Sequence, residues 1–130
     1  MFNWFRKKEK APVDFNALDA LAEKGDTQAQ QKLVELYYED DPKNYALSFK
    51  WARRLAAKTP DCCLMLQVAD MYDKGQGVAL DKKQALTWFE HTLSCSIMQG
   101  RNSPLSTDAL NYVQGRIQTL RAEVGAQPKN

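Results

Sequence analysis

The stretch from Tyr72 to Phe89, YDKGQGVALDKKQALTWF, contains residue types that could bind a phosphate group. Gly75 and Gly77 form a G-x-G, and lysines follow it. A phosphate-binding loop needs a preceding strand, and it needs glycines that let backbone N–H groups approach the ligand. Here a helical pattern precedes the glycines, and both the third glycine and a Gly-Lys-Ser/Thr ending are absent. We therefore interpret the G-x-G as a turn between two helices.

The same residues have ordinary roles in such a turn. Gly75 stands where a helix needs a left-handed residue at its C-terminal end. Asp81, with Gln84 three residues later, resembles a capping box at the start of the next helix. The sequence thus predicts a hairpin of two helices joined by a turn here, and no ligand-binding loop.

The remaining candidates for chemistry are few. His91 is the single histidine, and the residues around it complete no recognised metal-ligand pattern. No serine, cysteine or lysine lies in a recognisable nucleophile motif. We predict no catalytic residue, no metal ligand and no cofactor, so the chain is not expected to be an enzyme.

The three cysteines, Cys62, Cys63 and Cys95, fit no zinc spacing, and their odd number argues against complete disulfide pairing. We expect three free thiols. Cys62 and Cys63 begin one expected helix, and Cys95 ends its antiparallel mate. Whether either of them lies close to Cys95 stays open at this stage.

Composition limits the class of protein. The chain has 130 residues, of which 44% are apolar and 26% charged, as in an ordinary single globular domain. Its 18 basic and 16 acidic side chains give a net charge of +2, too even a balance for nucleic-acid binding. No apolar run is long enough for a signal peptide or a membrane span. We expect a cytoplasmic protein.

Apolar residues recur at helical spacing throughout, and there is almost no strand signal. Glycine, proline and acidic residues fall between the helical stretches. Pro42 is expected in the first turn of the third helix. The expected helices are 14–24, a segment from about 27 to the break at 39–42, a segment from Pro42 to Pro60, and 61–74, 81–96 and 106–124.

Two of these helix pairs repeat each other. Ala29-Gln30-x-x-Leu33-x-x-x-Tyr37 matches Leu64-Met65-x-x-Val68-Ala69-x-x-Tyr72 at a displacement of 35, and Phe49-x-Trp51 matches Leu86-x-Trp88 at 37. A partial copy at 21–26 resembles the end of a second helix. Internal repeats of this length are typical of helical solenoids.

These residues resemble the Sel-one-like repeat, a relative of the tetratricopeptide repeat. The second copy matches the family pattern most closely, while the first lacks both turn glycines. The matched positions of the second copy are Tyr72, Gly75, Gly77, Val78, Asp81, Ala85, Trp88 and Phe89; those of the first are Ala29, Gln30, Leu33, Tyr37, Trp51 and Ala56. The resemblance covers about residues 21–96.

The resemblance implies an all-α solenoid, in which antiparallel helix hairpins stack as a short right-handed superhelix with capping helices. The repeats would span about 27–60 and 61–96, with caps at 14–25 and 106–124, inside one domain of residues 14–124. Residues 1–13 would form a basic and aromatic N-terminal segment, and 125–130 a disordered tail. The aromatic residues at the repeat positions are expected to pack between helices.

The resemblance also implies a function. In such folds the first helix of each repeat lines a concave face that binds a protein or peptide, so we predict a non-enzymatic adaptor with no nucleic-acid partner. The expected partner-binding residues are Gln28, Gln31, Glu35, Tyr38, Cys63, Leu66, Asp70 and Asp73. This mixed acidic, amide and apolar surface suits an extended peptide or partner helix that carries basic residues.

Three alternatives remain, and the least favoured of them is an enzyme that carries no recognisable motif. Phe2, Trp4 and Phe5, followed by Arg6-Lys7-Lys8, could touch anionic lipid, which would make the chain a membrane-peripheral adaptor. The last helix carries one apolar stripe (Leu110, Val113, Ile117, Leu120 and Val124), which would favour a homodimer if it were left uncovered.

Overall fold

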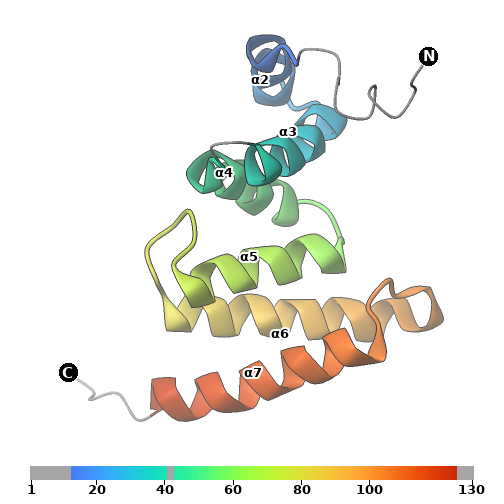
Figure 1. Cartoon of the computed structure of the whole chain (residues 1–130). Coiled ribbons are helices and arrows are strands. Elements are labelled where there is room, and N and C mark those ends of the chain that lie inside the picture. The colour runs from blue at the N-terminus through green and yellow to red at the C-terminus, as the bar shows by residue number, and fades with distance from the viewer. Residues whose placement is uncertain (1–12, 41–42, 126–130) are drawn as a thin grey trace, which may run out of the picture.

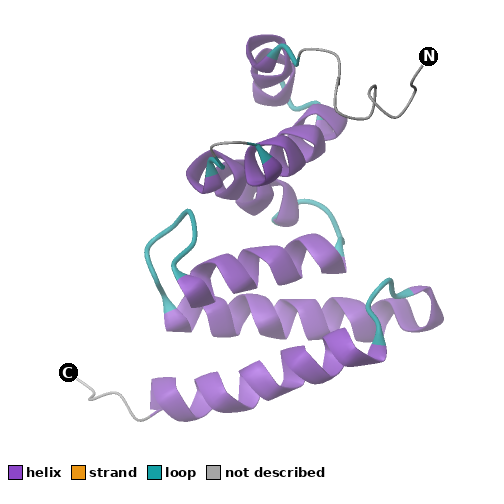
Figure 2. Ribbon diagram, in the orientation of Figure 1, coloured by secondary structure: helices purple, strands orange, loops and turns teal. Residues whose placement is uncertain are grey.

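The computed structural model describes residues 13–40 and 43–125. Within these ranges the chain folds into α-helices with no strand (Figure 2). The elements are α2 (Phe15–Glu23), α3 (Thr27–Glu39), α4 (Tyr45–Ala56), α5 (Cys62–Lys74), α6 (Lys82–Gln99), the short 3-10 helix η1 (Gly100–Asn102) and α7 (Thr107–Gly125). The predicted all-α solenoid is confirmed.

Each α-helix of the described residues begins at a side-chain cap, which accepts a hydrogen bond from the backbone N–H three residues later. The six caps are Asp14, Asp26, Asn44, Asp61, Asp81 and Ser106, with distances of 3.0–3.1 Å. The backbone N–H of Gln84 donates to the Asp81 side chain, which is one half of the expected capping box. The other half is missing, because the backbone N–H of Asp81 donates to the carbonyl of Tyr72, at 3.1 Å, and not to the Gln84 side chain.

The helices stack as successive antiparallel pairs, with α3 against α4 and α5 against α6 (Figure 1). The two turns share one closing hydrogen bond. Asn44 N–H donates to the Tyr37 carbonyl at 2.8 Å, as Asp81 N–H does to Tyr72. Each hairpin therefore closes at the same repeat position, although only the second has turn glycines.

The two turn glycines have different reasons to be glycine. Gly75 ends α5 in the left-handed conformation, with φ +67°. Gly77 also has positive φ, +79°, and a Cβ on it would lie 2.2 Å from the carbonyl oxygen of Tyr45 in the preceding hairpin. The G-x-G is therefore a helix cap followed by a close contact between backbones.

The core follows the stack. Trp51 and Phe89 are fully buried and Trp88 nearly so, inside one continuous apolar cluster that runs through α2 to α7. The Arg53 guanidinium lies 4.7 Å from the centre of the Trp88 ring, which links the two hairpins. The aromatic repeat positions thus pack between helices, as predicted.

The helix α7 closes the C-terminal end of the stack against α6. Its apolar stripe faces inward, because Val113, Ile117 and Leu120 are buried. The exposed side of α7 carries mostly polar residues, as a solenoid cap requires. The uncovered stripe on which a homodimer would have rested is therefore absent from the described surface of α7.

Some predicted boundaries differ from the structure. The helix α4 begins at Tyr45, while Pro42 lies outside the described residues. The helix α6 continues beyond the expected end at Ser96 to Gln99. It continues because no residue before Gly100, with φ +56°, interrupts it, and because Gln99 is anchored to the Pro60 carbonyl at 2.8 Å.

The N-terminal aromatic and basic residues, 1–12, and the tail residues 126–130 lie outside the described residues. Gly125, assigned to the tail from sequence, is the last residue of α7.

Candidate functional site

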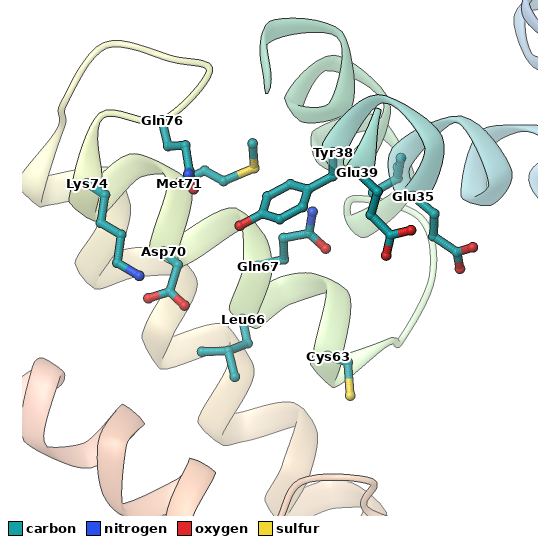
Figure 3. Close-up of a pocket in the computed structure, with 11 residues that line it drawn as sticks. Glu35, Tyr38, Glu39, Cys63, Leu66, Gln67, Asp70, Met71, Lys74 and Gln76 are labelled. Carbon is teal, nitrogen blue, oxygen red and sulfur yellow. The ribbon is translucent and has the colours of Figure 1, made fainter. Parts of the chain in front are cut away.

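A groove of about 350 Å³ runs between α3 and α5 (Figure 3). We refer to it as the α3–α5 groove. The residues that line it are Val34, Glu35, Tyr38 and Glu39 from α3, Cys63, Leu66, Gln67, Asp70, Met71 and Lys74 from α5, and Gln76 from the turn. The two walls are first helices of consecutive hairpins.

The groove is acidic with an apolar centre. Glu35, Glu39 and Asp70 contribute three carboxylates, against the single ammonium group of Lys74. Figure 3 shows the Tyr38 ring extending from α3 across the groove toward α5. The groove therefore offers negative charge around an aromatic platform.

The Tyr38 ring is held from behind by Tyr45 at the start of α4. The two ring centroids are 5.0 Å apart in an edge-to-face arrangement, at 62°. The backbone of Tyr45 is also the group that Gly77 approaches. The glycine turn of the second hairpin thus packs against the residue that supports Tyr38.

The equivalent space between α5 and α7 is bridged by polar contacts. The Asp73 carboxylate accepts hydrogen bonds from Arg116 at 2.9 Å and from Lys82 at 3.0 Å, and its side chain is only 7% exposed. Tyr112 Oη donates to Asp70 at 2.6 Å. We refer to this set of contacts as the α5–α7 seam.

The seam shifts the pKa values of its members. Burial tends to raise the pKa of Asp73, but the hydrogen bonds from Arg116 and Lys82 outweigh burial and hold the pKa below its usual value. The pKa of Arg116 is raised, mainly by its bond to Asp73. The pKa of Tyr112 is raised by burial and then by the bond to Asp70. In the seam, Asp73 and Arg116 therefore form a charged pair, and the hydroxyl group of Tyr112 stays protonated.

Comparison with known proteins identifies the architecture. A crystal structure of a Sel1 repeat protein from Oxalobacter formigenes is similar, with a TM-score of 0.53 and 20% sequence identity over 84% of this chain and 92% of that chain. The chain has a Sel1-like repeat fold. No protein-family model and no curated protein matches it. At 20% sequence identity, this similarity shows the fold alone.

In this Sel1-like fold the groove contains five of the eight partner-binding residues expected from sequence: Glu35, Tyr38, Cys63, Leu66 and Asp70. The other three lie elsewhere. Gln28 borders a shallow hollow with Leu18 and Leu21, and Gln31 is exposed on α3 outside the groove lining. Asp73 is engaged in the α5–α7 seam.

Sequence reasoning missed six groove residues, namely Val34, Glu39, Gln67, Met71, Lys74 and Gln76. Glu39 and Lys74 occupy the same position of the two repeats, 35 residues apart. The repeat displacement could have found this pair, because a position that ends each first helix lies at the same edge of the stack.

The cysteines take different environments. Cys62 is buried, and its Sγ lies 2.8 Å from Sγ of Cys95, while Cys63 is exposed; all three thiols are free. Burial, followed by the contact with Cys95, raises the pKa of Cys62 to about 12. The pKa of Cys63 is also raised, by burial and by nearby Asp61. Neither thiol is activated as a nucleophile.

The described residues offer little for other chemistry. His91 is exposed and packs edge-to-face on Trp88, at 5.3 Å between ring centroids. Within residues 13–40 and 43–125, no group of three or more histidine, cysteine or acidic side chains could hold a metal ion. In the same part of the chain, no helix is long and apolar enough to cross a membrane.

Proposed function

We propose that this chain is a non-catalytic adaptor whose α3–α5 groove binds an extended basic peptide segment of a partner protein. The observation that carries the proposal is the three-carboxylate groove around Tyr38. Aromatic residues anchor peptides by burying large areas, and carboxylates select for Lys and Arg.

The size of the groove suits a short peptide. It follows α5 from Cys63 to Lys74, which at 1.5 Å per residue spans roughly 17 Å. An extended chain rises about 3.3 Å per residue, so roughly five residues would fill the groove. Leu66 and Met71 supply apolar contacts on the α5 wall. The expected ligand combines two or more basic residues with an apolar or aromatic one.

The same chemistry argues against two other classes of function. A nucleic-acid phosphate would face an excess of carboxylates in this groove. Catalysis by Cys63, the one thiol in the groove, is disfavoured because its raised pKa keeps it protonated.

Selection from a displayed random peptide library against the full chain tests this function. Wild type should enrich peptides with clustered Lys and Arg next to an aromatic residue. The variant Glu35→Gln/Glu39→Gln should lose that enrichment, because it removes two of the three groove carboxylates. Both side chains are exposed, so their loss should change the free energy of unfolding by less than about 0.5 kcal/mol.

A matched control is the variant Asp108→Asn/Glu123→Gln, which removes the same charge from exposed positions of α7. It should enrich the same peptides as wild type. Equal loss of enrichment in both variants would show that net charge, and not the groove, selects the peptides. That result would overturn the proposed site.

A further inference from the structure

The described chain begins at the rim of the α3–α5 groove. Val13 borders a small hollow with Phe15, Leu36, Glu39 and Asp40. Glu39 belongs to this hollow and also to the groove lining. Residues 1–12 are therefore attached beside one of the groove carboxylates.

The residues attached there have the chemistry that the groove selects. Residues 1–10 read MFNWFRKKEK, with four basic side chains against one acidic one and three aromatic rings. The groove offers three carboxylates against one lysine, together with Tyr38, Leu66 and Met71. The two sets are complementary in charge and in apolar character.

The attachment also suits the geometry. Twelve extended residues reach roughly 40 Å, more than twice the roughly 17 Å length of the groove wall. A tethered ligand on a short linker has an effective concentration on the order of 1 mM. A segment with an intrinsic Kd of about 100 µM would then fill the groove about 90% of the time. A tethered segment with only modest intrinsic affinity would thus fill the groove most of the time.

We propose that the segment of residues 1–10 places roughly five of its residues in the α3–α5 groove of its own molecule, so that a partner peptide binds only when it displaces them. This inference rests on the proposed function, because the same groove and the same ligand chemistry are involved. The segment acts as an internal competitor, and at 90% occupancy it weakens partner binding about tenfold.

Cys63 is a built-in reporter of this occupancy, since its exposed thiol lies in the groove. Alkylation of the full chain with N-ethylmaleimide would be followed by mass spectrometry that resolves each cysteine. The variant Lys7→Glu/Lys8→Glu repels the segment from the carboxylates, so its Cys63 should react about tenfold faster than in wild type. The control Lys24→Glu/Lys83→Glu makes the same charge change at exposed positions elsewhere and should keep the wild-type rate.

The second measurement uses a fluorescent synthetic peptide with the sequence of residues 1–10 as the probe. Its binding to the full-length variant Lys7→Glu/Lys8→Glu should be about tenfold tighter than to the wild-type chain. Adding Glu35→Gln/Glu39→Gln to that variant should weaken the probe again. Both results together would support the inference.

The outcomes separate the two proposals. A probe that binds wild type and Lys7→Glu/Lys8→Glu equally, and is lost with Glu35→Gln/Glu39→Gln, would leave the groove as a peptide site and overturn the inference. If library peptides bind and the probe does not, the groove again remains a peptide site and the inference is overturned. Absence of binding by any basic peptide would overturn both. Protection of Cys63 that grows with protein concentration would indicate a second copy and contradict occupancy within one molecule.

Discussion

The α3–α5 groove and the α5–α7 seam are the same kind of space with opposite outcomes. The groove lies between α3 and α5, and the seam lies between α5 and α7, which stands where the first helix of a further hairpin would be. The groove is hollow, whereas the seam is bridged by side chains. Tyr38 and Asp73 occupy the same repeat position, 35 residues apart. Tyr38 lines the open groove, whereas Asp73 is bound by Arg116.

The difference arises from the neighbour and not from the position. The helix α7 brings Tyr112 and Arg116 to the acidic residues of α5. Glu35 and Tyr38 of α3 instead line an open groove. A terminal helix that satisfies the last inner face of a solenoid ends the stack. In the described part of the chain, no helix bridges the α3 side of α5 as α7 bridges its other side.

The largest expected effect comes from Gly77→Ala, which would damage the groove and spare the seam. A Cβ would lie 2.2 Å from the Tyr45 carbonyl oxygen, at a residue that already has positive φ. Overpacking against backbone and strain together should cost about 3 kcal/mol in the free energy of unfolding. Urea denaturation measures it. Gly25→Ala, also at positive φ but with open space around it, should cost only about 1 kcal/mol, and equal losses in both variants would refute the close contact.

Asp73→Asn should open the seam at a cost of about 2 kcal/mol at pH 7, because a buried carboxylate that accepts three charge-assisted hydrogen bonds from Arg116 and Lys82 becomes a neutral amide. The folded pKa of Asp73 lies below its unfolded value, so its stabilisation is complete above about pH 4. It disappears as the pH falls through the folded pKa. Urea unfolding of wild type and Asp73→Asn from pH 7 to pH 3 should show that the difference between their free energies of unfolding becomes smaller at the acid end. A difference that does not change with pH would contradict the charged seam.

Tyr112→Phe removes one hydrogen bond from the seam and frees Asp70, which also lines the groove. Tyr112 is 40% exposed, so the loss should be about 1 kcal/mol or less. Binding of a basic library peptide should become slightly tighter, because Asp70 no longer shares its charge with Tyr112. Thermal unfolding and a fluorescence titration measure the two effects, and weaker peptide binding would argue against a role for Asp70 in the groove.

The smallest change concerns the thiols and should leave stability untouched. Iodoacetamide should modify Cys63 well before Cys62, because Cys62 is buried and its pKa is about 12. Saturating groove peptide should slow modification of Cys63 several-fold and leave Cys62 and Cys95 unchanged. Site-resolved mass spectrometry reports both, and an unchanged Cys63 rate would place the peptide outside the groove.

Local sequence signals were enough to predict the helices and the role of Gly75, because caps and left-handed residues act within a few positions of the chain. The contact of Gly77 with Tyr45 joins two hairpins, so its physical reason appears only in three dimensions. The same limit explains the end of α6, where Gln99 bonds to Pro60 across the fold.

The candidate site was half predictable for a related reason. The sequence assigned one inner face to each first helix, whereas α5 has one side toward α3 and another toward α7. Asp73 lies on the second side and bonds to α7. Gln28 and Gln31 occupy the repeat positions of Cys63 and Leu66, which face a preceding first helix. No such helix precedes α3 within the described residues.

The most direct test of the central claim, that the groove binds and the seam does not, is a ¹H–¹⁵N nuclear magnetic resonance titration of the full chain. The ligand is the strongest peptide from the library selection. We predict shift changes concentrated in residues 34–39 and 63–76. Changes concentrated in α7 or α2, with the groove residues unmoved, would contradict it.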